Sequence, residues 1–119
     1  LARLVGSCGA TLVTPVWDEP YGLVVAESLA CGTPVACFAR GGIPEIVGEH
    51  AGVLVPPGDI DALALAVDDA LTLDRGLVRR RAEDHCSDIA MIDRYLDLYA
   101  DLVAGRPLAD SSLPWEVGV

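Results

Sequence analysis

Two acidic residues and a glycine lie close together in the first quarter of the chain, in an order suited to binding phosphates and hydroxyl groups. Glu19 and Gly22 precede residues 23–31, which are long enough for two to three helical turns, and Glu27 lies within that segment. The first amides of a helix lack partners inside it and carry a positive partial charge, so we expect an anion there. Gly22 has no Cβ and permits close approach.

The carboxylates suit the hydroxyl groups of the same ligand. A carboxylate near a crevice accepts two hydroxyl hydrogen bonds, so Glu27 could hold a ribose diol and Glu19 a sugar. Taken alone, an acid before a helix and another in its second turn are more often a complement to the helix dipole and a solvated face. Both interpretations stay open on spacing alone.

The charge balance restricts the partners. The chain has eight arginines, no lysine and eighteen acidic residues, giving a net charge of −10. Such a charge repels a phosphate backbone and an anionic membrane surface, so nucleic acid is not expected as a partner. Ligand phosphates must rely on backbone donors or on groups from elsewhere. No apolar run reaches the ~18 residues of a membrane-spanning helix.

The elements that must position these residues alternate between strands and helices. Three nearly continuous apolar runs are predicted as buried strands, at residues 11–15, 34–38 and 52–57. Helices are expected at residues 1–7, 23–31, 44–47, 60–73, 75–85 and 88–103. This order indicates an α/β fold, a three-layer Rossmann-like parallel sheet with right-handed crossovers. Ligands bind such sheets beyond the carboxyl ends of the strands.

Turn and capping residues mark the element boundaries. Gly32 is expected to end its helix in the left-handed conformation, and Asp59 and Ser87 are placed to cap helices. Gly41 and Gly42 follow the second strand, where the backbone must turn tightly or approach another group closely. The segment at 75–85 is expected to be basic and exposed. Tyr95 and Tyr99 of the last helix are expected in the core. They belong to the apolar face of that helix, which consists of Ile92, Tyr95, Leu96, Tyr99, Leu102 and Val103.

Residues 18–35 resemble the signature of glycosyltransferase family 4, in which seven residues separate two glutamates. The likeness continues through residues 41–47 and 52–59, and it covers roughly residues 1–104. It implies the GT-B fold, in which two Rossmann-like domains face across a cleft, and it relates this chain to the second half of the carboxyl-terminal donor domain. It also implies sugar transfer with retention from a nucleotide diphosphate sugar, with no metal and no other cofactor.

The resemblance assigns roles to individual residues. It implies that Glu19 is catalytic and bonds the hydroxyls of the donor sugar, and that Glu27 holds the ribose. Tyr21 and the amides of Gly22, Leu23 and Val24 would contact the donor, with those amides on the diphosphate.

The sequence departs from the family pattern in two ways. The cationic Arg and Lys pair of the family has no match here, and Val16 replaces the usual serine. The chain by itself is therefore expected to be inactive.

The chain is expected to belong to a longer product, since it opens without Met or a signal pattern. The amino-terminal domain, with most of the contacts to an unidentified acceptor, would precede it, and an open sheet edge could pair with another copy. Residues 105–119 are expected to form an irregular tail unless Leu113 and Trp115 dock. The four cysteines are interpreted as free, buried thiols in the cytoplasm.

Two alternatives to a transferase remain open. One is a nucleotide-sugar binding or regulatory module without catalysis, and the other is a Rossmann-like interaction domain without a ligand. His50 and His85 lack companions at metal-ligand spacing and are interpreted as structural, as are the cysteines. Glu45 could shape the donor loop, although its position in a first helical turn already explains it.

Overall fold

A computed structural model describes residues 1–107 of the 119-residue chain. Within this range three parallel strands form one sheet in the order β1-β2-β3. Their bounds are β1 Thr11–Val13, β2 Val35–Phe38 and β3 Gly52–Val55. β2 is central, and its Val35 lies opposite Thr11 of β1 and Gly52 of β3. All three strands therefore end at one edge of the sheet.

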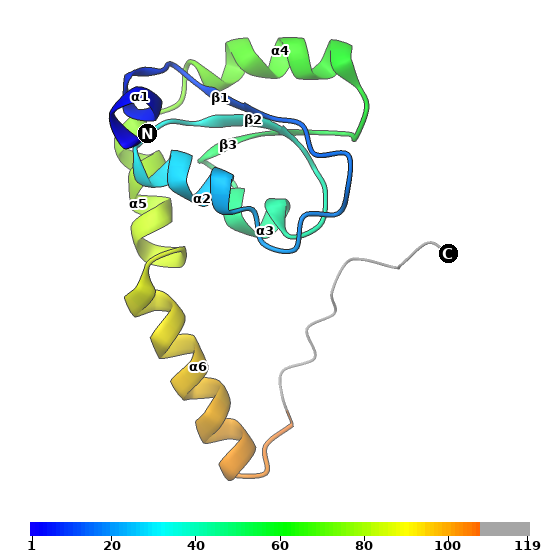
Figure 1. Cartoon of the computed structure of the whole chain (residues 1–119). Helices are drawn as coiled ribbons and strands as arrows, with labels where there is room; N and C mark the ends of the chain where they lie inside the picture. Colours follow the sequence, from blue (N-terminus) through cyan, green and yellow to red (C-terminus); the bar gives the residue numbers. More distant parts are fainter. Residues whose placement is uncertain (108–119) are drawn as a thin grey trace.

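Helices cover both faces of this sheet (Figure 1). Their bounds are α1 Ala2–Ser7, α2 Leu23–Ala30, α3 Ile43–Val47, α4 Ile60–Ala70, α5 Arg75–His85 and α6 Asp88–Val103. α4 packs on one face, whereas α2, α3 and α5 pack on the other. The predicted three-layer α/β fold is confirmed.

The central strand divides the core into two halves. Val35 and Cys37 face the cluster formed with α2, α3 and α5, whereas Ala36 and Phe38 face α4. All four side chains are buried, as expected for a strand covered on both faces. Burial raises the pKa of the Cys37 thiol to about 12. In the described part of the chain all four cysteines are free thiols, but only Cys37 is fully buried.

The predicted boundaries agree with the structure where a capping residue marks them. The Asp59 carboxylate accepts a 2.9 Å hydrogen bond from the amide of Ala62 at the start of α4. The Ser87 hydroxyl accepts one of 3.2 Å from the amide of Ala90 at the start of α6. Gly32 follows α2 with φ of 69°, as its predicted role as a left-handed stop requires.

Two predictions about burial were wrong. The first strand was expected to be fully buried, but β1 is an edge of the sheet formed by residues 1–107, and Leu12 is 56% exposed. The segment at 75–85 was expected to be exposed, but α5 buries Val78 and Ala82 against the core. Its arginines hide this stripe in the sequence, because two buried residues leave a weak periodic signal.

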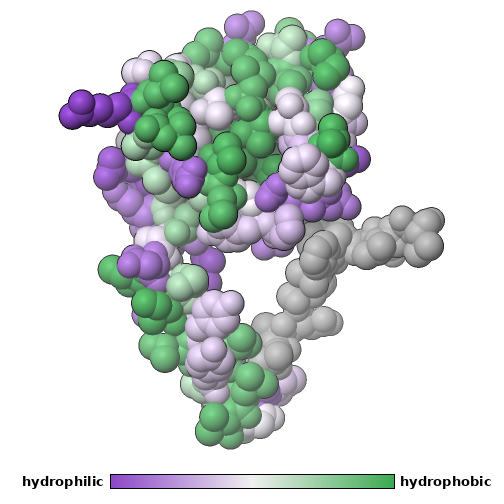
Figure 2. Space-filling view, viewed as in Figure 1, coloured by the Kyte–Doolittle hydropathy of each residue, from purple (hydrophilic) through white to green (hydrophobic). Residues whose placement is uncertain are grey.

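The expected burial of the last helix was also wrong. α6 extends away from the sheet, and its apolar side chains lie in the open (Figures 1 and 2). Tyr95 is 51% exposed and Tyr99 56%, and their ring centroids are 6.0 Å apart. Periodicity identifies the apolar face of a helix but not the surface that covers it.

The expected irregular tail lies almost wholly beyond the described residues. Leu113 and Trp115 fall outside them, so their docking stays a prediction. Among residues 1–107, no helix has the length and apolar character needed to cross a membrane.

Candidate functional site

A hollow of about 310 Å³ lies where β1 ends and α2 begins. The last residues of the strand, the loop after it and the first turn of the helix line this hollow. Glu19, Gly22, Leu23 and Val24 all take part, together with Trp17 from the same loop. The structure therefore brings four of the six predicted site residues to one concave surface at the carboxyl edge of the sheet, where open α/β sheets bind ligands.

Glu19 is positioned by its neighbours on the loop. The indole Nε1 of Trp17 donates a 3.0 Å hydrogen bond to its Oε2. The guanidinium of Arg40 donates to the carbonyl of Val16 on the same loop. A carboxylate can accept further bonds at its second oxygen, so the side chain of Glu19 keeps capacity for a hydroxyl group.

The double glycine after β2 brings a second loop against the one that carries Glu19. The amide of Gly42 donates a 2.7 Å hydrogen bond to the carbonyl of Glu19. A Cβ on Gly41, whose φ is +53°, would lie 2.6 Å from the amide nitrogen of Glu19, and a Cβ on Gly42 would lie 2.6 Å from the carbonyl oxygen of Pro20. Both distances are shorter than any non-bonded contact that a Cβ makes in a folded protein. The close approach predicted for this glycine pair is therefore an approach to the loop of Glu19.

The start of α2 presents unpaired amides to the same hollow. Gly22 has φ of +100°, a conformation that glycine adopts freely, and no side chain within residues 1–107 caps the helix there. The first helical hydrogen bond runs from the amide of Ala26 to the carbonyl of Gly22, at 3.0 Å. The amides of residues 23–25 precede it, and they are the donors that a helix start offers to an anion.

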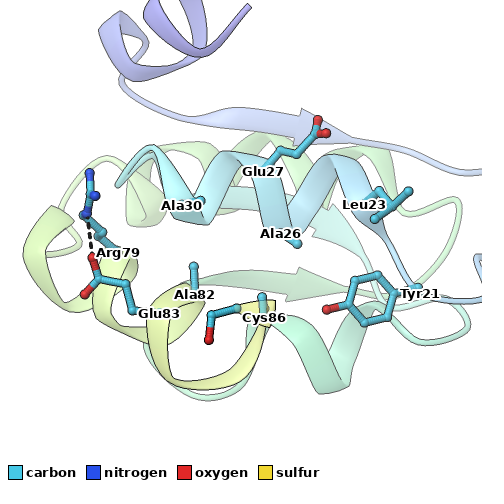
Figure 3. A pocket seen from close by; sticks show the side chains of 10 residues that line it. Tyr21, Leu23, Ala26, Glu27, Ala30, Arg79, Ala82, Glu83 and Cys86 are labelled. Carbon is cyan, nitrogen blue, oxygen red and sulfur yellow. Dashed lines mark hydrogen bonds and ion pairs between the residues drawn. The ribbon is translucent and has the colours of Figure 1, made fainter. Parts of the chain in front are cut away.

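Glu27 and Tyr21 line a neighbouring hollow of about 320 Å³ between α2 and α5. Figure 3 shows the Tyr21 ring directed toward Cys86, whereas the Glu27 carboxylate extends from α2 away from both. Burial raises the pKa of Tyr21, and both the charge of the Cys86 side chain and hydrogen bonding to it raise that pKa further. The positive charge of Arg94 acts in the opposite direction.

The two glutamates therefore line different hollows that meet at Leu23. Leu23 belongs to both, being 66% exposed in the first turn of α2. Glu27 follows Leu23 by four residues, so the two side chains lie on one face of the helix, one turn apart. A ligand that contacts both glutamates must cross Leu23.

The electrostatics of this edge differ from those of a site with built-in cations. Among residues 1–107, Glu19 is the one charged side chain that lines the first hollow. No three His, Cys, Asp or Glu side chains in this range are grouped to hold a metal. Positive potential at the hollow comes from the helix start, which is worth about 0.3–1 kcal/mol to an anion at an exposed site.

Sequence reasoning missed two contributors. Trp17 was not considered, and its indole is the donor that orients Glu19. Arg40 was not among the predicted site residues, but its hydrogen bond to the carbonyl of Val16 fixes the loop. The sequence signal that could have identified Trp17 is its position two residues before an acidic residue in a loop between a strand and a helix.

This architecture, with its crevice at the carboxyl edge, is that of open α/β domains that bind ligands at strand ends. Comparison with known proteins identifies the family. The family model described as "Glycosyl transferases group 1" matches residues 1–85, and the chain belongs to this family.

Individual relatives agree with this assignment. The chain is 36% identical to the D-inositol 3-phosphate glycosyltransferase of Mycobacterium marinum, over 77% of this chain and 22% of the relative. It is 35% identical to the protein of the same name from Mycobacterium ulcerans, over the same shares. It is 38% identical to the O-antigen chain mannosyltransferase B of Escherichia coli, over 54% of this chain and 16% of that protein. The chain thus spans about a fifth of the length of the mycobacterial relatives.

Proposed function

We propose that this chain forms the donor-binding part of a retaining glycosyltransferase of family 4, within a longer protein with the GT-B fold. Residues 1–104 would be the second half of the donor domain, and 105–119 its tail. The observation that carries the proposal is the juxtaposition of Glu19 with the uncapped start of α2 on one hollow. Membership of the group 1 family supports it.

The donor in this proposal is a nucleotide diphosphate sugar. Its diphosphate lies at the amides of Gly22, Leu23 and Val24, and Glu19 accepts hydrogen bonds from hydroxyls of the sugar. The ribose reaches past Leu23 to the carboxylate of Glu27. Tyr21 lines the ribose side of the ligand. Leu23 and Val24 are 66% and 59% exposed, which supports their availability to a ligand.

Catalysis in this proposal rests on positioning and electrostatics. The bond from the anomeric carbon to the diphosphate breaks, the sugar passes to the acceptor with retention, and negative charge grows on the departing phosphate. Amides that are already oriented stabilise such charge without reorganisation. The cations that the hollow lacks, and the acceptor contacts, would come from the remainder of the protein, so we expect this chain alone to be inactive and to use no metal.

The compartment is part of the proposal. Four free thiols fit a reducing environment, and we place the protein in the cytoplasm on that basis.

A binding module without catalysis is the second candidate. None of the residues 1–107 that line the first hollow is cationic, which favours this candidate, because donor binding requires less charge stabilisation than bond breaking. Release of nucleoside diphosphate distinguishes the transferase from the binding module. Release of nucleoside diphosphate from a donor in the absence of acceptor, by the protein of the complete reading frame, supports the transferase, and its absence supports the module.

Hydrogen exchange on the 119-residue chain tests the donor site directly. Adding UDP, GDP or ADP is expected to slow exchange of the amides of residues 22–24, because the diphosphate accepts their hydrogens. The first turn of α4, capped by Asp59, is the control and is expected to be unchanged. Equal effects on both helix starts, or none with any of the three nucleotides, would contradict the proposal.

A further inference from the structure

A third hollow, of about 440 Å³, lies between α5 and the loop that joins α3 to β3. It shares no lining residue with the two hollows already described. The loop leads into the amino end of β3, so this hollow is away from the carboxyl edge where the donor is proposed. Four of its side chains carry cationic or imidazole groups, in a chain with a net charge of −10: His50, Arg80, Arg81 and His85.

Arg81 is fixed at this hollow by the end of α3. Its guanidinium donates to the carbonyl of Ile46 at 3.0 Å and to that of Glu45, the last turn of the helix. Gly48 allows the approach: its φ is +60°, and a Cβ there would lie 3.0 Å from Nε of Arg81. A guanidinium has five N–H donors, so Arg81 keeps donors for a ligand while held rigidly in place.

The three consecutive arginines of α5 have different surroundings. Arg79 pairs with Glu83 at 2.8 Å on the side of α5 that faces α2. Arg80 lines the third hollow and makes no hydrogen bond or ion pair with any of residues 1–107. Its charge is therefore available to a ligand in the hollow that Arg81 also lines.

The histidines add donors to the same surface. Nδ1 of His85 is 2.8 Å from the guanidinium of Arg94 on α6. Burial lowers the pKa of His85, as do the charges of Arg81 and Arg94, against the opposing effect of Asp84. His50 is 3.8 Å from Glu49, which among residues 1–107 is the one acidic side chain that lines the hollow and is 91% exposed and free to turn into solvent.

We propose that this hollow binds a phosphate monoester, held by Arg80 and Arg81 with His50 and His85 at its rim. Two guanidinium groups on one hollow suit the oxygens of a dianionic phosphate, and that of Arg81 is already oriented by the protein. The ligand could be a small phosphorylated molecule or the phosphate headgroup of a lipid. This hollow is separate from the proposed donor site, so the test of phosphate binding does not depend on whether the chain belongs to a transferase.

Calorimetric titration of the 119-residue chain with inorganic phosphate at constant ionic strength tests the site. Saturable binding is expected, and Arg80→Gln is expected to weaken it about tenfold, the effect of losing a charge-assisted contact. Arg79→Gln is the matched control, since it removes the same charge one residue away from a different surface. Absence of saturable binding, or equal weakening in the two variants, overturns the proposal.

A second variant keeps the test decisive if Arg80→Gln fails to fold by circular dichroism. Glu49→Gln removes the acidic side chain that lines the hollow and is expected to strengthen phosphate binding by about threefold. Unchanged or weaker binding in this variant overturns the proposal.

Two experiments distinguish a small phosphorylated molecule from a lipid headgroup as the ligand. Glycerol 3-phosphate is titrated into the chain, and phosphatidylcholine vesicles with and without phosphatidic acid are sedimented with it. Binding of the first alone, sensitive to Arg80→Gln, supports a soluble ligand, and binding of the vesicles that contain phosphatidic acid supports a lipid. Failure of both arms overturns the site.

Discussion

The amide of Gly42 donates a 2.7 Å hydrogen bond to the carbonyl of Glu19, joining the loops that leave β2 and β1. Neither loop has regular structure of its own. A side chain on Gly41 or Gly42 would displace the backbone of the loop that carries Glu19. The position of the Glu19 backbone thus depends on a residue that follows it by more than twenty positions. Glycine is required because the backbones are in contact.

Gly41→Ala is expected to destabilise the fold more than Gly58→Ala. Both glycines have positive φ, of +53° and +85°, so both variants incur the same kind of backbone strain. A Cβ on Gly58 meets nothing within 4 Å, whereas one on Gly41 collides with the backbone of Glu19. We expect an additional loss of about 1 to 3 kcal/mol in the free energy of unfolding, measured with urea. Equal losses in the two variants would show that the loops are not in contact.

Glu27→Ala is expected to weaken binding of the nucleoside diphosphate by about 1 to 3 kcal/mol, because a charge-assisted contact to the ribose is lost. The measurement is calorimetry on the protein of the complete reading frame. Asp68→Ala is the control, since Asp68 is an exposed acid on α4, across the sheet from the donor hollow. Unchanged affinity in Glu27→Ala would remove the ribose assignment.

Glu19→Ala is expected to lower kcat more than donor affinity. In the proposed mechanism its carboxylate contacts the sugar that moves, so its contribution increases as the bond breaks. Steady-state kinetics of the complete protein, combined with calorimetric donor affinity, separate the two effects. A loss of affinity equal to the loss of kcat/KM, with kcat preserved, would mean that Glu19 only binds the donor.

The buried thiol of Cys37 predicts how stability changes at alkaline pH. Its folded pKa is about 12, whereas a thiol in an unfolded chain ionises near pH ~8.5. Between these values the unfolded chain releases a proton that the folded chain keeps, so the free energy of unfolding falls as pH rises, by up to about 1.4 kcal/mol per pH unit. Below this window the thiol is protonated in both states and contributes no pH dependence.

Urea unfolding of the wild type and of Cys37→Ala, on both sides of the point where the unfolded thiol ionises, tests this. The substitution creates a cavity and lowers stability below this window, but it is expected to remove the alkaline slope. Parallel pH profiles for the two proteins would contradict the assignment.

Arg75→Ala is expected to cost about 1 to 3 kcal/mol of stability. Its guanidinium donates to the carbonyls of Cys8 and Gly6 at 2.7 and 2.8 Å and to the Thr33 hydroxyl at 2.9 Å. Arg79→Ala is the control, because an exposed pair such as the one with Glu83 is worth about 0 to 1 kcal/mol. The difference is read from urea unfolding, and similar losses would mean that Arg75 does not join α5 to the segment before β1.

Local sequence patterns determined the order and type of the elements. Apolar runs predicted the strands, and Asp59, Ser87 and Gly32 marked helix ends, because capping and left-handed turns depend on one residue and its nearest neighbours. The gathering of Glu19, Gly22, Leu23 and Val24 was also predictable, since all four lie within one run of six residues, 19–24, where the loop after a strand leads into the next helix.

Tertiary structure decided which surfaces meet. The same periodicity that located α6 could not tell that Tyr95 and Tyr99 are exposed within residues 1–107, and the arginines of α5 concealed the burial of Val78. The partners of Gly42 and Arg81 are distant in sequence, and no local propensity encodes such contacts. An element forms from interactions along the chain, whereas its burial and its partners depend on the rest of the molecule.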